Sequence, residues 1–302
     1  VEHWNGLQTP TPSFVLQLGD LIDGQNAGGY GAGLNFKEPQ SDVALRQVTS
    51  KLAHCTAPIY HAIGNHELYN FRWDGIRSRL QGQPDPHQRS VWQVTTEGVE
   101  AGALKPFRIR HGAEGGQGWT FLMLNAYAVS VEQEPTQPGY GEALALLAVH
   151  NPGCHAALAS GRTQGIDFFA GVTNNADLRF VPFNGGFGTE QREWLRAELR
   201  SAVARGDRIV VMSHLPLYEP ASSPRTLAYD ADEVLSLLRT EAKGHVAACF
   251  AGHLHHGGYA RDADGIHHVT LPSPLNYDLC FGHVDVYASR LEWHPHPHVH
   301  PH

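Results

Sequence analysis

Short apolar runs, each ended by glycine or polar residues, recur along the chain. Five of them have the length and continuity of buried strands, and two more alternate apolar and polar residues as half-buried strands do. The predicted strands are residues 14–18, 58–63, 119–125, 208–212, 246–250, 266–271 and 283–288.

Three other segments repeat their apolar residues every three or four positions, which predicts helices. They cover residues 42–54, 189–205 and 232–238. In the longest of them Thr189 can serve as the N-cap, and Gly206 falls just beyond the end. The glycine-rich residues 24–33 predict a flexible loop. Strands alternate with helices and give way to a strand-rich end, so we predict an α/β fold with mixed sheets.

We find no internal repeat or long linker, so residues 1–293 are expected to form one domain. Residues 294–302 read HPHPHVHPH and form a separate His/Pro-rich tail. Such a tail can neither pack a core nor form a helix, and we expect it to be disordered. Its five histidines could bind metal ions adventitiously, and we assign it no catalytic role.

Composition and charge narrow the possible partners. The 302 residues carry a formal net charge of −8, which provides no basic surface for nucleic acid. No apolar run approaches the roughly 20 residues that span a bilayer, and we expect no membrane association. The four cysteines show no CxxC spacing, which favours a reducing, cytoplasmic location. We expect a monomer that acts on a small molecule. An anionic substrate would then need a metal ion to neutralise it.

Polar side chains of metal-binding type directly follow four of the predicted strands. They are Asp20 and Asp23 after residues 14–18, Asn65, His66 and Glu67 after 58–63, His214 after 208–212, and His253 and His255 after 246–250. In α/β sheets, reactive groups gather outside the carboxyl ends of strands, so these four segments can converge on one crevice. Gly19, Gly64 and Gly252 precede the polar residues and suit sharp turns.

This set of side chains has a defined chemistry. Carboxylate, amide oxygen and imidazole suit Mn²⁺, Fe or Zn²⁺ better than Ca²⁺, and the lack of thiolates disfavours a structural zinc site. Two ions about 3.5–4 Å apart can activate a water and neutralise phosphate charge. Each motif alone has a plainer explanation, such as a turn or a buried core histidine. Their joint occurrence, each after a strand, favours a metal centre.

The segments GDLID, GNHE, SHLP and GHLH resemble the calcineurin-like metallophosphoesterase superfamily. The longer stretches LQLGDLIDG, GNHELYNF, FNGGFGTEQREWL and AGHLHHGGY are similar to its manganese-dependent ADP-ribose/CDP-alcohol diphosphatase branch. The resemblance runs from about Val15 to about Val286. It implies one domain of two mixed β-sheets packed face to face, with helices outside.

The resemblance also implies two divalent ions, with manganese the first expectation and Fe, Zn or Mg as alternatives. The implied roles are metal bridging for Asp20, completion of one metal site for Asn65, His214 and His253, and the other metal site for His255. By the same resemblance, His66 would stabilise or protonate the leaving oxygen, and Asp23 would pair with His66 and orient it.

One departure bears on these roles. Members of the superfamily open with a strand that ends in D-x-H, or D-x-Q in this branch, and this sequence shows no such segment. We therefore expect the fold to lack the family's first strand, which leaves one metal site with only Asp20 and His255. Either the sequence is a fragment of a complete enzyme, or it binds one ion well and the other poorly.

Candidate substrate contacts are Tyr69, Asn184, Gly185 and Gly186. Asn184, with its two glycines, could lie over a nucleotide and donate hydrogen bonds, or it could form only the turn before the following helix. Tyr69 could meet the substrate or simply pack.

The function that the resemblance implies is hydrolysis of the pyrophosphate in ADP-ribose, CDP-choline or related nucleoside diphosphate-X compounds. ADP-ribose would yield AMP and ribose 5-phosphate. Two alternatives stay open: another dinuclear-metal phosphodiesterase, for example one acting on cyclic nucleotides, and a truncated, non-catalytic nucleotide- or metal-binding relative. A protein Ser/Thr phosphatase is disfavoured, because GDLIDGQ lacks the arginine of GDxVDRG.

Overall fold

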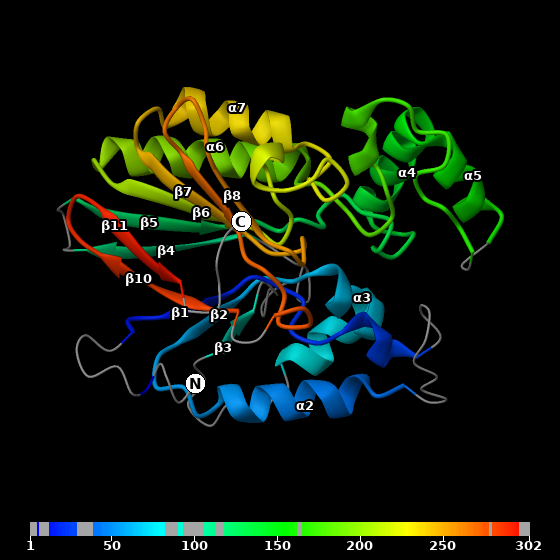
Figure 1. Cartoon of the computed structure of the whole chain (residues 1–302), viewed down its shortest axis with the longest axis horizontal. Coiled ribbons are helices and arrows are strands. Elements are labelled where there is room, and N and C mark those ends of the chain that lie inside the picture. Colours follow the sequence, from blue (N-terminus) through cyan, green and yellow to red (C-terminus); the bar gives the residue numbers. More distant parts are fainter. Residues whose placement is uncertain are drawn as a thin grey trace.

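A six-stranded mixed sheet forms one layer of the fold (Figure 1). Its strands are β4 (Phe107–Gly112), β5 (Gly118–Met123), β6 (Arg208–Met212), β7 (Val246–Ala251), β8 (Gly258–Arg261) and β9 (His267–Thr270), in the order β4-β5-β6-β7-β9-β8. The four central strands are parallel, and the two edge strands are antiparallel to their neighbours. This computed structural model describes residues 5, 12–28, 39–81, 90–92, 106–112, 117–161, 165–277 and 280–295.

A second layer of strands faces this sheet (Figure 1). It contains the parallel strands β1 (Val15–Gln17), β2 (Ile59–His61) and β3 (Ser90–Trp92), and the antiparallel hairpin β10 (Gly282–Val286) and β11 (Leu291–Pro295). Apolar side chains such as Leu18, Ala62, Met123 and Val210 fill the space between the layers. The predicted α/β fold with two layers of strands is confirmed.

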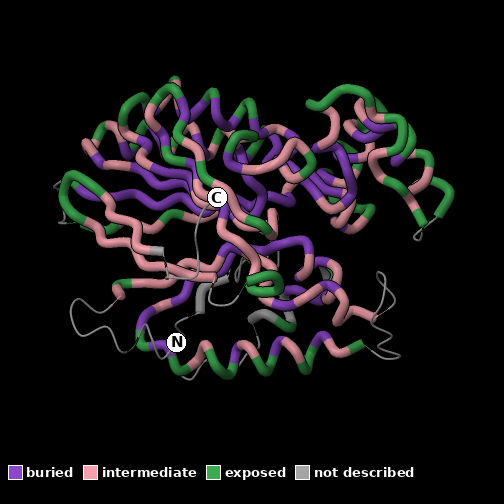
Figure 2. The backbone as a smooth tube through the Cα atoms, in the orientation of Figure 1, coloured by how far each residue is buried: buried purple, intermediate pink, exposed green. Residues whose placement is uncertain are grey.

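Helices cover the outer faces of both layers. They are α6 (Gly188–Ala204) and α7 (Ala231–Glu241) on the six-stranded sheet, and α2 (Ser41–Leu52) and α3 (Asn65–Gln81) on the second layer (Figure 1). A large apolar core lies beneath the helices, and the central strands β5 to β7 are almost wholly buried (Figure 2). Two further helices, α4 (Pro138–His150) and α5 (Pro152–Ala159), pack on each other to one side.

The predicted elements agree with the observed ones apart from their ends, but three local predictions change. Residues 24–33 do not begin as an irregular loop, because Gly24–Ala27 forms a 3₁₀ turn, η1; residues 29–33 lie outside the described part. Helix α6 begins at Gly188, so Thr189 is not its N-cap. Strand β11 continues to Pro295 and so includes the first two residues of the expected tail, and residues 296–302 are not among those described.

Within the described residues, β1 lies at the edge of its sheet and pairs only with β2. The expected lack of a further strand beside β1 therefore stays a prediction. None of the described helices combines the length and the apolar character that crossing a bilayer requires. The four cysteines form no disulfide with one another within the described part of the chain.

One buried carboxylate fixes the far end of the six-stranded sheet. Asp207, in the turn between α6 and β6, has no exposed surface and accepts hydrogen bonds from the side chains of Arg110, Arg205 and Thr120 and from the N–H of Gly118, all at 2.8–3.0 Å. Burial opposes ionisation, but these donors together lower the pKa of Asp207 well below its usual value.

We predict that Asp207→Asn lowers the free energy of unfolding at pH 7 by about 3–5 kcal/mol, because it removes the negative charge and replaces one of the two shared acceptor oxygens by an NH₂ group that faces the arginines. The lowered pKa means that the ionised carboxylate stabilises the fold above about pH 4, and that this stability is lost as the pH falls below that value. Urea unfolding at pH 7 and pH 3 should therefore show a smaller acid-induced loss in the variant.

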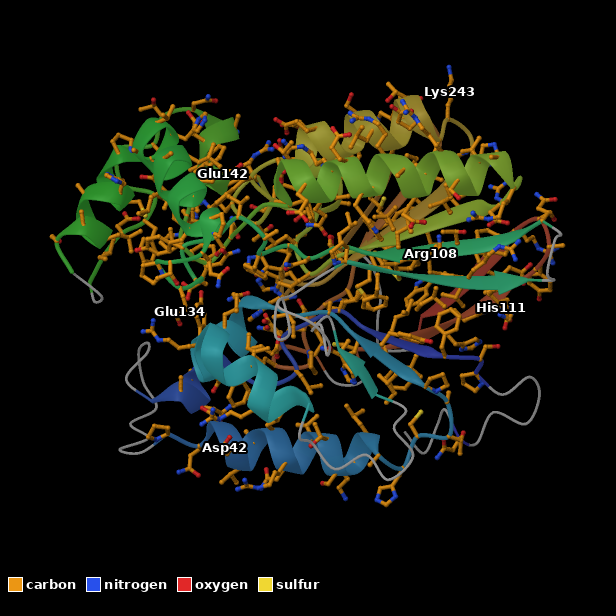
Figure 3. All side chains as sticks on the ribbon, turned by 180° about the vertical axis from the view of Figure 1, so that it is seen from behind. Asp42, Arg108, His111, Glu134, Glu142 and Lys243 are labelled. Carbon is orange, nitrogen blue, oxygen red and sulfur yellow. The ribbon has the colours of Figure 1, made fainter. Side chains whose placement is uncertain are left out.

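The matched control is Asp42→Asn. Asp42 pairs with Arg79 on the exposed side of α2 (Figure 3) and should change the free energy of unfolding by less than about 1 kcal/mol. An Asp207→Asn variant as stable as this control would contradict the prediction.

Candidate metal centre

Four side chains from four separate segments meet where strands of the two layers end. Asp20 lies beyond the end of β1, Asn65 begins α3 after β2, His214 follows β6 and His253 follows β7. Asp20, His214 and His253 each offer a ligand atom within one small group, and Asn65 lies against them. The predicted convergence of the four strand ends is what the structure shows.

The ligand atoms lie close around one point. Nε2 of His214 is 3.3 Å from Oδ2 of Asp20 and 3.1 Å from Oδ1 of Asn65. Nδ1 of His253 is 3.2 Å from the same His214 nitrogen and 3.0 Å from the Asn65 oxygen. These separations are those of neighbouring ligands on an ion about 2.1 Å from each of them.

Hydrogen bonds from surrounding residues orient His214 and Asn65 so that each directs a lone pair at the centre of the group. Nδ1 of His214 lies 2.7 Å from the carbonyl oxygen of Leu18 and so carries the proton, which leaves Nε2 for the centre. The hydroxyl of Tyr127 donates to Oδ1 of Asn65 at 3.2 Å.

Asn184 fixes the tautomer of His253 through a hydrogen bond on the outer side of the ring. Both N–H bonds of the Asn184 amide are used, one by the carbonyl of Arg179 and one by that of Arg225, each at 2.8 Å. Its oxygen therefore faces Nε2 of His253, 2.9 Å away, and accepts the proton of that nitrogen. Nδ1 of His253 is left with its lone pair directed at the centre.

The arrangement fits a divalent cation. Burial opposes ionisation of Asp20, but the nearby imidazoles, His214 first, lower its pKa. Asp20 in turn raises the pKa of His214 against the effect of burial, whereas burial and His214 lower the pKa of His253. At most one proton therefore lies among four inward-facing donor atoms. A divalent ion would replace that proton and coordinate all four.

The backbone around Asp20 is strained and firmly held. Asp20 and His253 both adopt positive φ angles, 55° and 66°, which for non-glycine residues are uncommon and costly. Oδ1 of Asp20 accepts the N–H of His66 in the first turn of α3 at 2.9 Å, while Oδ2 faces the centre. The carboxylate thus bridges the helix start and the metal group.

Glu67 stabilises the turn at Asp20 by accepting backbone hydrogen bonds. Its fully buried carboxylate accepts the N–H groups of Gly64, Asp20 and Leu21 at 2.6–2.9 Å. Burial and the Asp20 carboxylate raise the pKa of Glu67 to about 7. Glu67 is visible in the GNHE motif, but the motif does not reveal its role, because its three hydrogen-bond partners become neighbours only in the fold.

Two glycines allow the strand ends to approach. A Cβ on Gly19, whose φ is 93°, would lie 2.5 Å from Nδ1 of His214. A Cβ on Gly64 would overlap the Asp20 carboxylate. The glycines predicted for close backbone approach are therefore needed at these two positions.

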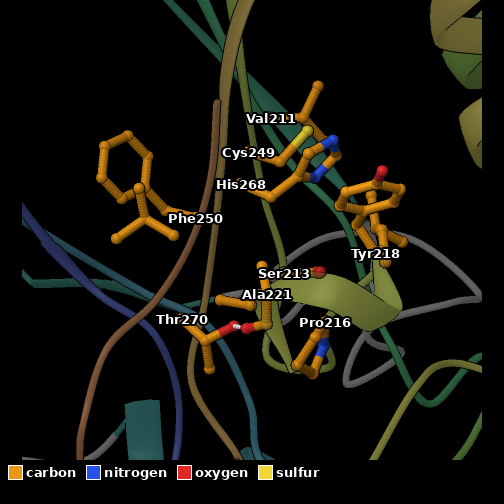
Figure 4. Close-up of a pocket in the computed structure, with 12 residues that line it drawn as sticks. Val211, Ser213, Pro216, Tyr218, Ala221, Cys249, Phe250, His268 and Thr270 are labelled. Atoms are coloured by element: carbon orange, nitrogen blue, oxygen red, sulfur yellow. Dashed lines mark hydrogen bonds between the residues drawn. The ribbon is translucent and has the colours of Figure 1, made fainter. Parts of the chain in front are cut away.

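The residues that follow His214 are held against strand β9 by a hydrogen bond and a ring contact. The hydroxyl of Thr270 on β9 donates to the carbonyl of Ala221 at 2.8 Å, in the turn that follows this segment (Figure 4). The ring of Tyr218 packs against His268. Burial lowers the pKa of His268 to about 4, so this imidazole is a neutral packing group at pH 7.

His66 stands beside the metal group with its proton in a defined place. The N–H of Gly24 donates to Nδ1 of His66 at 3.0 Å, so the neutral ring carries its proton on Nε2, 4.0 Å from Oδ2 of Asp20. Asp23 is 3.9 Å from Nδ1, close but beyond hydrogen-bond distance. It instead caps η1 by accepting the N–H of Gln25, which fixes the turn that presents Gly24. The expected pairing of Asp23 with His66 rests on this 3.9 Å contact and stays a prediction.

The other candidates occupy different positions. The ring of His255 lies 6.4 Å from that of His66, next to the group rather than within it. Tyr69 is half-buried, with its ring 5.6 Å from that of His66. Gly186 pairs with Val129 through backbone hydrogen bonds, and Gly185 is packed tightly against Ala126.

Asn184 was expected either to donate to a nucleotide or to form a turn. The donor role is wrong, because Asn184 is fully buried and both of its N–H bonds are spent on protein carbonyls. Its role behind His253 has no local sequence signal, since the two residues are 69 positions apart.

Comparison with known proteins agrees with this geometry. The profile of the calcineurin-like phosphoesterase family matches residues 1–257. The chain belongs to the calcineurin-like phosphoesterase family. It is therefore a hydrolase of the metallophosphoesterase class.

Relatives of this phosphoesterase include the manganese-dependent ADP-ribose/CDP-alcohol diphosphatases of Bos taurus and Homo sapiens. They are 32% and 30% identical to it over 96% of this chain, which corresponds to 78% and 77% of their own length. The crystal structure of a dimetal phosphatase from Danio rerio is similar, with a TM-score of 0.71 and 28% identity over 94% of this chain and 80% of that one.

The phosphoesterase should lose metal affinity when Asn184 is replaced by Leu. Without the acceptor, the proton of His253 is free to move to Nδ1, where it blocks coordination, and loss of such a supporting contact typically costs 10–100-fold in affinity. Calorimetric titration of the metal-stripped protein with Mn²⁺ measures this loss directly.

Asn151→Leu is a closely matched control. Asn151 is equally buried, donates to two carbonyls, those of Phe168 and Phe180, and accepts one proton, from the N–H of Cys154. It belongs to the α4–α5 region, so its loss should destabilise the fold without changing Mn²⁺ affinity. Equal losses of affinity in the two variants would show that Asn184 acts only on stability.

Proposed function

We propose that this protein hydrolyses the pyrophosphate bond of ADP-ribose, CDP-choline or a related nucleoside diphosphate-X compound, with two divalent ions, Mn²⁺ first. The names of the relatives support this substrate class. The expected products are a nucleoside monophosphate and a phosphorylated partner. ADP-ribose would give AMP and ribose 5-phosphate, and CDP-choline would give CMP and phosphocholine.

The observation that carries the proposal is the proton on Nε2 of His66. Hydrolysis of a phosphoanhydride adds water to one phosphorus and breaks its bond to the bridging oxygen, which must leave with negative charge or with a proton. The N–H of Gly24 occupies Nδ1 of His66 and leaves a proton on Nε2, next to the metal group. His66 can therefore donate a hydrogen bond from Nε2 to the leaving oxygen and stabilise the negative charge that develops on it.

The residues around the centre supply the remaining parts. Divalent ions bound there would neutralise phosphoryl charge and make water a better nucleophile. Asp20, Asn65, His214 and His253 would hold one ion, while Asp20 and His255 would contribute to the site of the second. Asp23 would position His66 through the η1 turn, and Tyr69 lies beside His66, where a bound nucleotide could contact it.

His66→Ala should lower kcat for ADP-ribose by about 10²–10³-fold, because the Nε2–H donor to the leaving oxygen is lost. Metal content, measured by mass spectrometry of the purified protein, should stay within the range of the parent. His155→Ala, on the distant helix α5, serves as the control and should leave both quantities unchanged.

Two outcomes would contradict these assignments. If His66→Ala loses its metal, His66 is a ligand rather than a hydrogen-bond donor to the leaving oxygen. If the parent protein with Mn²⁺ releases no AMP from ADP-ribose and no CMP from CDP-choline, while it cleaves another phosphodiester, the substrate class is wrong.

A further inference from the structure

The C-terminal hairpin has two chemically different faces. Val284 pairs across the strands with Trp293, and Val286 with Leu291. Trp293 packs on Phe250 of the six-stranded sheet, and Val286 and Leu291 join the core between the layers. Because side chains alternate along a strand, the residues between these pairs project from the opposite face.

That opposite face brings two histidines and an aspartate together. His283 pairs across the strands with His294, and Asp285 follows His283 by two positions on the same side. Ligand atoms of these three residues lie within 4.8 Å of one another. The two imidazole rings are stacked, with centroids 4.6 Å apart and planes 17° from parallel.

Ligand atoms of His294 and Asp285 lie next to each other on this face. Nε2 of His294 is 3.1 Å from Oδ2 of Asp285, yet it makes no hydrogen bond within the described part of the chain. The fourth residue of this face, Glu292, is paired with Arg290 at 2.6 Å, so Asp285 supplies the carboxylate that faces the rings. The side chains of His294 and Asp285 are 43% and 35% exposed, which gives an ion a path from solvent.

We propose that His283, Asp285 and His294 bind one divalent transition-metal ion, Zn²⁺ or Ni²⁺, at a site separate from the catalytic centre. Two imidazoles and one carboxylate are donors that Zn²⁺ and Ni²⁺ accept readily, whereas Mg²⁺ and Ca²⁺ prefer oxygen ligands alone. The 3.1 Å between His294 and Asp285 is the spacing of adjacent ligands on an ion about 2.1 Å from each. Since its ligands come from both strands, the ion ties β11 to β10 and stabilises the hairpin.

The test must separate this site from the catalytic centre and from the histidines that follow Pro295 in the sequence. Metal-stripped protein is titrated calorimetrically with Zn²⁺ in four forms: the parent, His283→Gln, His111→Gln, and a chain that ends at Pro295. His111 is an exposed histidine on another strand, β4, and serves as the matched control (Figure 3). Hydrolytic activity with Mn²⁺ and the melting temperature without metal are recorded for each form.

The parent, the control and the chain ending at Pro295 should bind one equivalent of Zn²⁺ more than His283→Gln binds. Zn²⁺ should also raise the melting temperature of the parent more than that of His283→Gln. Activity and metal-free melting temperature should be equal in the parent and the variant, which shows that the fold and the catalytic centre are intact. Asp285→Asn gives a second variant in case His283→Gln does not fold.

The proposal is overturned if His283→Gln or Asp285→Asn binds as many equivalents as the parent. It is also overturned if the equivalent is lost only when residues 296–302 are removed, because the tail would then be the binding site. Neither result depends on which phosphate compound the enzyme hydrolyses.

Discussion

The Asp20 carboxylate is the point on which both halves of the molecule depend. One of its oxygens accepts the N–H of His66 in the first turn of α3, which belongs to the smaller layer, and the other faces His214 from the six-stranded sheet. A buried carboxylate is costly unless cations and hydrogen-bond donors compensate it. The strained turn, the clamp by Glu67 and the two close glycines are arranged to present this one anion.

A cation at this point accounts for features that packing alone does not explain. Supporting contacts from Leu18 and Asn184 fix the tautomers of His214 and His253, so that each ring turns a lone pair inward. Without an ion, four electron-rich atoms share at most one proton. An ion bound by Asp20, Asn65, His214 and His253 would give each of these donors a partner and would offset the strained backbone at Asp20 and His253.

Much of the fold and of the catalytic group could be predicted because the signal is local. A buried strand followed at once by a ligand residue is visible in a few letters, and the observed β6 matches its predicted bounds. Helix α3 was missed because it begins within the GNHE motif and is interrupted by the non-helical backbone of Arg72. The role of Asn184 and the clamp by Glu67 depend on contacts between distant segments, which no short motif reports.

The cluster of His283, Asp285 and His294 on the hairpin could be predicted only in part from the sequence. The histidines that begin the tail were visible in the sequence, but His283 and His294 become a pair only through the register of β10 and β11. A one-residue shift in that register would place the rings on opposite faces. The sequence could therefore indicate metal-binding chemistry near the C-terminus without locating it.

The most direct test of the account is an anomalous-scattering experiment on a crystal of this protein grown with Mn²⁺. The account predicts an anomalous peak about 2.0–2.3 Å from Oδ2 of Asp20, Oδ1 of Asn65, Nε2 of His214 and Nδ1 of His253. A crystal with Mn²⁺ elsewhere, and with His214 hydrogen-bonded directly to Asp20 in place of an ion, would contradict it.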